Sequence, residues 1–354
     1  MASLDDALGR LLDGGGPPAA VTRGMLAGLR EALAQVTPDA PEADEAITRL
    51  LTAAEPGTPR PAEVTAPPAR AARPDRLLAE VWARAIPITA ERNPGEPPTD
   101  PGRLWDEIHL LGLRISADER TDLTTRAVAA ARAVGAEPGD PATVIPGPAR
   151  ETLIPSLRSG DRTLSTGLAT DPAAPAPAGL PGDGGAETAA LIRLIAPVME
   201  LVTRDRHLTH CLQVLQFRGL ASLAPTGEQD RLRAQMVSRV AAVAAARAYT
   251  DDWLESLVRA HEAVVSVVHV PPAPDGSWWG GLRLQAHTLV RDGAGLVATG
   301  QVKLPPARFT AARALTDHDI PLKVPESTGM VLACVRVWSR IHDTESPGRV
   351  IYAS

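Results

Sequence analysis

Apolar side chains recur every three or four residues through most of the chain, a spacing that gathers them on one face of an α-helix. In the first 135 residues this pattern predicts helices near 4–12, 19–36, 41–54, 75–90, 101–113 and 117–135. Ser116 followed by Glu119 is typical of a helix start, because the two side chains can cap each other's backbone N–H groups. From residue 187 the pattern predicts three more helices, at 187–202 with a kink or an interruption at Pro197, at 203–223, and at 226–262, the last capped by Thr226 and Gln229.

After residue 262 the apolar period shortens to two, which predicts strands. The candidate strands are 263–270, 282–290, 296–304, 330–341 and 349–354. In the second of them Leu282, Leu284 and Ala286 alternate with polar residues. A sheet with one apolar face must be covered by another layer, so we expect a mostly antiparallel sheet of about five strands backed by helices. The predicted fold class is α+β, with an all-helical N-terminal region.

Proline and glycine divide the chain into three predicted parts. Residues 1–135 form an acidic helical region with a Pro-rich linker at 56–74. Residues 136–186 are rich in Pro, Gly and Ala and predict a linker that is mobile at 170–185. Residues 187–354 are expected to form an α+β domain, with helices in 187–262 and the sheet in 263–354.

Composition narrows the class of protein. The chain has 354 residues, of which 44% are hydrophobic but only 3% aromatic, so aliphatic side chains must supply most of the core. The formal charge is −6 and no segment concentrates the Lys or Arg that phosphate binding requires, which argues against a nucleic-acid partner. No apolar run approaches the roughly 18–20 residues that span a bilayer. With Asp5 and Asp6 near its start and only two cysteines, the protein is expected to be soluble and cytoplasmic, with no membrane partner.

Three metal-binding residue types fall close together in the predicted 203–223 helix. His207, His210 and Cys211 would lie within one turn, where side chains at i, i+3 and i+4 converge. A tetrahedral zinc site needs a further ligand, and no second Cys/His pair has the right spacing. The preferred interpretation is therefore a buried helix face without a metal, and a metal site is the alternative.

Two short polar segments are the best catalytic candidates. One holds Asp317, His318 and Asp319, and the other, at 342–346, begins with His342 and Asp343. If the segments met in space, these groups could provide a general base with its orienting acid, or a divalent-metal site. Solvated loops between strands have the same composition without any catalytic role.

Two familiar motifs are incomplete. His261 opens a segment that would fit a zinc protease only with a second histidine at position 265, which is valine. The glycine-rich segment 181–186 precedes a predicted helix, but Ala186 and Glu187 stand where a phosphate-binding loop has Lys and Ser or Thr.

Trp278 and Trp279 stand side by side in the sequence, with glycines on both sides. In a strand they would face opposite ways, so at least one indole should be exposed. An exposed Trp on a rigid element is a common anchor for a partner, whereas two buried ones would simply fill the core.

These patterns favour a non-enzymatic interaction, adaptor or regulatory protein that uses the C-terminal α+β domain as a binding module. We expect another protein as its partner and no cofactor. The alternative is a hydrolase with an active site built from loops 317–319 and 342–346. A hydrolase should bring these loops together in one concave pocket, whereas an adaptor should have a grooved apolar surface.

Overall fold

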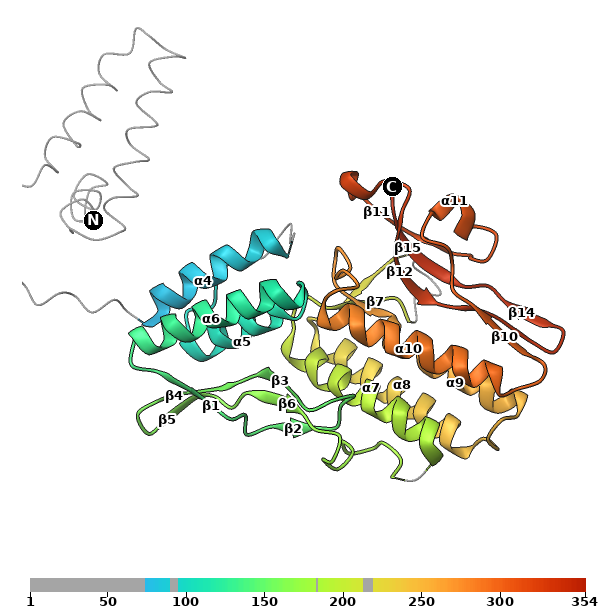
Figure 1. Ribbon diagram of the computed structural model, residues 1–354, viewed down its shortest axis with the longest axis horizontal. Coiled ribbons are helices and arrows are strands. Elements are labelled where there is room, and N and C mark those ends of the chain that lie inside the picture. Colours follow the sequence, from blue (N-terminus) through green and yellow to red (C-terminus); the bar gives the residue numbers. More distant parts are fainter. Residues whose placement is uncertain (1–73, 90–94, 183, 213–218) are drawn as a thin grey trace, which may run out of the picture. The chain divides into compact units, whose positions relative to one another are not determined.

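The computed structural model of the chain describes residues 74–89, 95–182, 184–212 and 219–354, which have an α+β fold (Figure 1). Ala71–Ser354 belong to one compact unit. The helices expected near 4–12, 19–36 and 41–54, and nearly all of the Pro-rich segment 56–74, lie outside the described residues.

Three helices open the described part of the chain close to where the apolar pattern places them: α4 (Pro74–Ile88), α5 (Pro101–Gly112) and α6 (Ala117–Ala133). The predicted capping box begins α6, since Ser116 Oγ accepts a hydrogen bond from Glu119 N at 3.4 Å and Glu119 Oε2 accepts one from Ser116 N at 3.1 Å. α5 begins at Asp100, whose carboxylate accepts a hydrogen bond from Arg103 N.

The segment 136–186, which was expected as a linker, contains six short strands. They are β1 (Glu137–Gly139), β2 (Val144–Ile145), β3 (Glu151–Ile154), β4 (Ser156–Ser159), β5 (Arg162–Ser165) and β6 (Leu168–Thr170). Their sheets have the orders β1-β4-β5 and β2-β6-β3. α5 contacts β3 and β5, and α6 contacts β1 (Figure 1). Ile154, Leu157 and Leu168 are fully buried there, which gives the strands a core of their own to pack on.

Four longer helices follow: α7 (Gly185–Arg204), α8 (Thr226–Ala245), α9 (Asp251–Val265) and α10 (Trp278–Gly295). α7 continues through Pro197, where the sequence predicted an interruption. The single helix predicted over 226–262 is two helices, because Ala246 turns to an extended conformation and the Thr250 hydroxyl caps a new start at Trp253 N. Thr226 does not form the predicted capping box, since α8 begins after Pro225 without a side-chain cap.

Three further predictions about this region were wrong in whole or in part. In place of the helix expected from residue 203, α7 ends at Arg204 and a short strand follows. This strand, β7 (Thr209–His210), pairs with β8 (Ala221–Ser222) and β9 (Val267–Val268). The strand expected at 282–290 lies inside α10. Of the strand expected at 263–270, the first three residues end α9 and only β9 is a strand.

The C-terminal strands are β10 (Gly300–Lys303), β11 (Ile320–Leu322), β12 (Val331–Arg336), β13 (Trp338–Ile341), β14 (Thr344–Ser346) and β15 (Arg349–Ala353). Two short helices, α11 (Phe309–Ala312) and η1 (Pro325–Ser327), lie between them in the sequence. The strands predicted at 296–304, 330–341 and 349–354 are present, but they form two three-stranded sheets, β10-β13-β14 and β11-β15-β12, in place of one five-stranded sheet. Only the β11–β15 pairing in these two sheets is parallel. α9 packs on β12 and β13.

One hydrophobic cluster extends from Leu78 in α4 to Val337, and it includes buried residues of α5, β3, α7, α9 and α10. A second, smaller cluster lies beneath the C-terminal sheet and contains Cys211, Val268, Ile320, Ala333, Val335 and Ile351. Apolar residues from both sides of residue 186 thus belong to the same cluster. A division of the chain into independent modules at that position stays a prediction.

Candidate functional site

His207, His210 and Cys211 do not converge, because they lie in a turn and a short strand and not in a helix. His207 Nε2 lies 4.0 Å from Glu107 of α5, and His210 Nε2 lies 3.5 Å from Glu228 of α8. The Cys211 thiol points to the carbonyl oxygen of Ser266 at the end of α9. The three side chains therefore contact three different helices, α5, α8 and α9. Within the described ranges, no group of three His, Cys, Asp or Glu has a geometry that could hold a metal ion.

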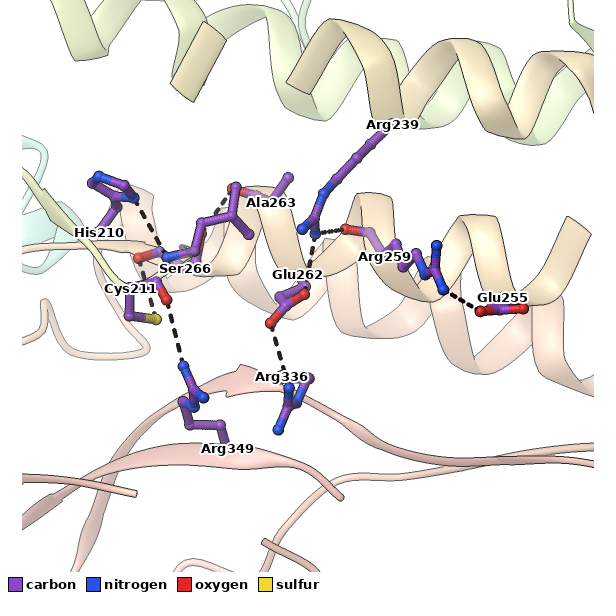
Figure 2. A network of polar contacts seen from close by, with 11 residues as sticks. His210, Cys211, Arg239, Glu255, Arg259, Glu262, Ala263, Ser266, Arg336 and Arg349 are labelled. Carbon is purple, nitrogen blue, oxygen red and sulfur yellow. Dashed lines mark hydrogen bonds and ion pairs between the residues drawn. The ribbon is translucent and has the colours of Figure 1, made fainter. Parts of the chain in front are cut away.

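A polar network surrounds Cys211 and links the helices to the C-terminal sheet (Figure 2). Glu262 of α9 accepts a hydrogen bond from Arg239 of α8 at 3.1 Å and lies 4.0 Å from Arg336 at the end of β12. Arg349 of β15 donates to the carbonyl oxygen of Cys211. Glu262 thus links α9 to α8 and to β12, and its side chain is only 16% exposed. This arrangement holds α8, α9 and the sheet together.

The two thiols are poorly suited to nucleophilic chemistry. Burial raises the pKa of Cys211 to about 12, and the same cause raises the pKa of Cys334 to about 12. Both are free thiols. A thiol with such a pKa is protonated at neutral pH, and the thiolate is the form that attacks substrates or binds metals.

The two candidate catalytic loops are held apart by the hairpin between them. Asp317 N donates to the carbonyl oxygen of Gly348, whereas His342 lies at the hairpin tip with its Nδ1 atom 2.6 Å from Asp251 of α9. With a rise of about 3.3 Å per residue, the strand from Thr344 to Gly348 alone spans about 13 Å.

Within their own loops the carboxylates have structural partners. Asp319 accepts hydrogen bonds from Val350 N at 2.9 Å and from the Thr316 hydroxyl at 2.8 Å, while His318 lies 3.4 Å from Asp317. Asp343, beside His342, is exposed. These contacts order the hairpin, and they give the hydrolase hypothesis no geometric support.

A buried acid–base pair that the sequence did not single out lies at the end of α7. Asp205 Oδ2 lies 2.8 Å from His269 Nε2, and both side chains are almost fully buried. Burial by itself would raise the pKa of Asp205, but the charge and hydrogen bond of His269 and the charge of Arg114 outweigh it and lower the pKa to about 2. The cavity beside Asp205 has a volume of about 10 Å³, too small for a substrate. The pair therefore joins the end of α7 to the residue after β9.

The tryptophan pair begins α10. Trp279 is 2% exposed and meets His269 edge-to-face with ring centroids 5.4 Å apart, whereas Trp278 is half-buried and packs edge-to-face on Trp279. The expectation that strand geometry would separate the indoles was wrong, since both lie on a helix. Their positions follow from the helix start, where Ser277 Oγ accepts a hydrogen bond from Gly280 N and donates one to the carbonyl oxygen of Pro274.

Trp278 lines one end of a groove along the exposed side of α10. Its first pocket, of about 220 Å³, lies between Trp278, Gln285, Arg120 of α6 and the segment Pro148–Glu151. A second pocket, of about 450 Å³, continues along α10 and is bounded by α7. Pro148 and Gln285 line both pockets, so the two pockets are adjacent, and together they are called the groove below.

The second pocket combines apolar walls with two charged side chains, Arg193 of α7 and Asp292 of α10. Leu194, Leu284 and Leu289 line it, and Leu284 is 63% exposed, an unusual position for a leucine on a regular helix. Arg193 of α7 also lines it and forms no ion pair with any described residue. The pocket therefore offers an apolar surface beside a guanidinium that forms no ion pair within the described residues, and the Asp292 carboxylate belongs to the same lining.

The wall opposite α10 is fixed by a buried threonine. The Thr170 hydroxyl, 1% exposed, lies 2.7 Å from the carbonyl oxygen of Ala149 and accepts a hydrogen bond from Glu151 N. Gly147 passes so close to Thr170 that a Cβ atom there would lie 2.2 Å from the threonine Cβ. Sequence reasoning missed Thr170, Gly147 and Arg193, since contacts between segments far apart in the chain give these residues their places.

None of the helices in the described ranges is both long and apolar enough to cross a membrane. No protein-family model, no curated protein and no solved structure matches this chain.

Proposed function

We propose that this chain is a non-enzymatic protein-interaction module whose groove along α10 binds an extended peptide segment of a partner protein. The observation that carries the proposal is the second pocket, which is lined both by exposed Leu284 and by Arg193, a residue without an ion pair among the described residues. An apolar surface next to a cation fits a peptide with a large apolar residue adjacent to Asp or Glu.

The groove has the form that a peptide requires. Successive pockets along one helix accept successive side chains, and Trp278 offers a rigid aromatic surface in the first pocket. The capped start of α10 and the threonine-fixed wall keep both sides of the groove in place, so little conformational entropy is lost on binding. An adaptor or regulatory role would follow from the partner that the groove selects.

Selection of random peptides displayed on phage, with the immobilised full chain as the target, tests the proposal. We expect enrichment of sequences in which a large apolar residue adjoins an acidic one. A synthetic peptide with the enriched sequence should bind wild type in a fluorescence-anisotropy titration. Leu284→Asp should weaken binding by about tenfold or more, because it removes the apolar contact and repels the acidic residue.

Leu296→Asp is the matched control, since Leu296 is 54% exposed at the end of the same helix but does not line either pocket. It should leave the affinity within about twofold of wild type. The proposal fails if no sequence is enriched, or if Leu284→Asp and Leu296→Asp bind the selected peptide equally well.

A further inference from the structure

The second pocket of the groove carries two opposite charges that do not neutralise each other. Arg193 of α7 and Asp292 of α10 both line this pocket, yet they form no ion pair with each other. Asp292 lies 3.6 Å from its neighbour Arg291, but these side chains are 67% and 62% exposed, and such a surface pair is weak. Both charges of the pocket are therefore available to a ligand.

The two helices that bear these charges run in opposite directions. In the first turn of α7, Glu187 accepts a hydrogen bond from the Tyr249 hydroxyl, and Tyr249 packs edge-to-face on Trp253. Trp253 in turn lies against the end of α10, where a Cβ atom at Gly293 would be 3.2 Å from its ring. The opposite ends meet where the tryptophan pair contacts the buried acid–base pair that follows α7. The start of α7 is thus beside the end of α10.

This arrangement gives the lining a fixed order along the groove. With a helical rise of about 1.5 Å per residue, Asp292 lies about 12 Å beyond Leu284 along α10. On α7, Arg193 lies about 9 Å beyond Glu187, whose level is near that of Gly293. Because the helices are antiparallel, the level of Arg193 falls between those of Leu284 and Asp292. The order is therefore apolar surface, cation, anion.

An extended peptide can match this order residue by residue. Its rise is about 3.3 Å per residue, and successive side chains face opposite sides. Four residues cover about 13 Å, close to the separation of Leu284 and Asp292, and residues four apart face the same wall, here α10. The residue next to the first faces the other wall, where Arg193 lies on α7.

We propose that the groove selects a peptide in which an apolar residue at Leu284 is followed by an acidic residue at Arg193 and, three positions further, by a basic residue at Asp292. This inference rests on the proposed peptide-binding function and adds a specificity-determining residue, Asp292. A peptide with the two charges exchanged would place each beside a like charge, so the pocket also rejects the wrong order.

Two phage libraries of decapeptides test this order against the immobilised full chain. One has Leu-Glu fixed at its centre and the other Glu-Leu, because a peptide can enter the groove in either direction, and all other positions are random. In one library, Lys and Arg should be enriched by about threefold or more at the third residue beyond the Glu, on the side away from the Leu. No enrichment there, or equal enrichment on the leucine side, would overturn the inference.

Variants of Asp292 connect the preference to this side chain. Asp292→Asn should abolish the enrichment of Lys and Arg, and Asp292→Lys should replace it with enrichment of Asp and Glu at the same position. Asp230→Lys is the matched control, since Asp230 is exposed on α8, lines neither pocket of the groove and undergoes the same change of charge. It should select the same peptides as wild type. Selection of Lys or Arg by Asp292→Lys would contradict the assignment.

The same experiment separates this inference from the proposed function. If wild type retains clones that Leu284→Asp does not, but no position prefers Lys or Arg, the groove binds peptides and only the role of Asp292 is wrong. If neither library yields clones above the background of uncoated wells, both the proposed function and this inference fail.

Discussion

At the scale of single residues, neutral histidines are the most unusual buried groups of the described core. His261 Nε2 and His287 Nδ1 are 2.8 Å apart, so one ring donates to the other and neither carries a charge. Burial, with the charge of Arg283, lowers the pKa of His287 to about 4, and burial lowers the pKa of His261 further below its ordinary value. The pair lies between α9 and α10, where burial opposes the uptake of a proton.

These histidines predict a loss of stability in mild acid. Below pH about 6.5 the histidines of the unfolded chain take up protons, while His109 and His287 stay neutral down to about pH 4. The unfolded state then binds more protons, so the free energy of unfolding should fall as the pH falls through this window, by roughly 1.4 kcal/mol per pH unit for each histidine. Urea titrations at several pH values measure the slope. His287→Gln should reduce this slope by the contribution of one histidine, roughly 1.4 kcal/mol per pH unit. An unchanged slope would argue against a neutral buried ring.

Glu262 and Glu255 offer a comparison between a buried and an exposed carboxylate on one helix. Glu262 contacts Arg239 and Arg336, whereas Glu255 pairs only with Arg259, and both members of that pair are more than half exposed (Figure 2). Glu262→Gln should lower the free energy of unfolding by about 2–4 kcal/mol, because it leaves two partly buried arginines without their charge partner. Glu255→Gln should cost less than about 1 kcal/mol. Thermal unfolding compares the two, and equal losses would contradict the structural role of Glu262.

At the scale of elements, helices could be predicted where apolar residues recur with the helical period and Pro-rich or capping segments mark the ends. The bounds of α4, α5 and α6 lie within two residues of those expected. The strand predicted at 282–290 failed for a geometric reason. Leu282, Ala286 and Val290 are four residues apart, a spacing that fits both a strand face and a helix face. Trp279, three residues before Leu282, continues the buried set only with the helical period, and exposed Leu284 breaks the strand pattern.

The candidate site was largely beyond prediction. Trp278 was selected from the sequence and lines the groove, but for the wrong structural reason. Arg193, Pro148 and Thr170 come from three separate segments, and no local pattern indicates that strand pairing between β3 and β6 brings two of them to α10. The helix at 203–223 failed because a favourable apolar period was overruled by pairing of β7 with β8 and β9, contacts between residues far apart in the chain.

Ser277 sets the position of α10, and its removal should affect stability and groove together. Ser277→Ala loses the hydrogen bond from Gly280 N and the hydrogen bond to Pro274, at a site that is 4% exposed. We expect a loss of about 1–2 kcal/mol in the free energy of unfolding, measured with urea. Thr203→Ala, on the exposed side of α7, is the control and should cost less than about 0.5 kcal/mol. A cost for Ser277→Ala no larger than the control's would show that the cap does not hold the helix start.

At the scale of the whole molecule, the question is whether 74–354 unfolds as one unit or divides near residue 186. The shared cluster from Leu78 to Val337 favours one unit, because either fragment alone would expose part of that surface. The segment between β6 and α7 is consistent with this, since Leu180 is buried in the same cluster while most residues from 172 to 179 are exposed.

Limited proteolysis separates these possibilities. Elastase, which cleaves after small residues, should cut the exposed alanines between 172 and 178 and give two bands on a denaturing gel. If one core joins the two sides, the cut protein should elute from a native sizing column at the volume of the intact chain and unfold in a single thermal transition a few degrees lower, because the break adds conformational freedom only to the unfolded state. If the fragments separate and the C-terminal one remains compact, the chain consists of two modules and the groove, which needs α7, α10 and the segment around Pro148, would exist only while they are joined.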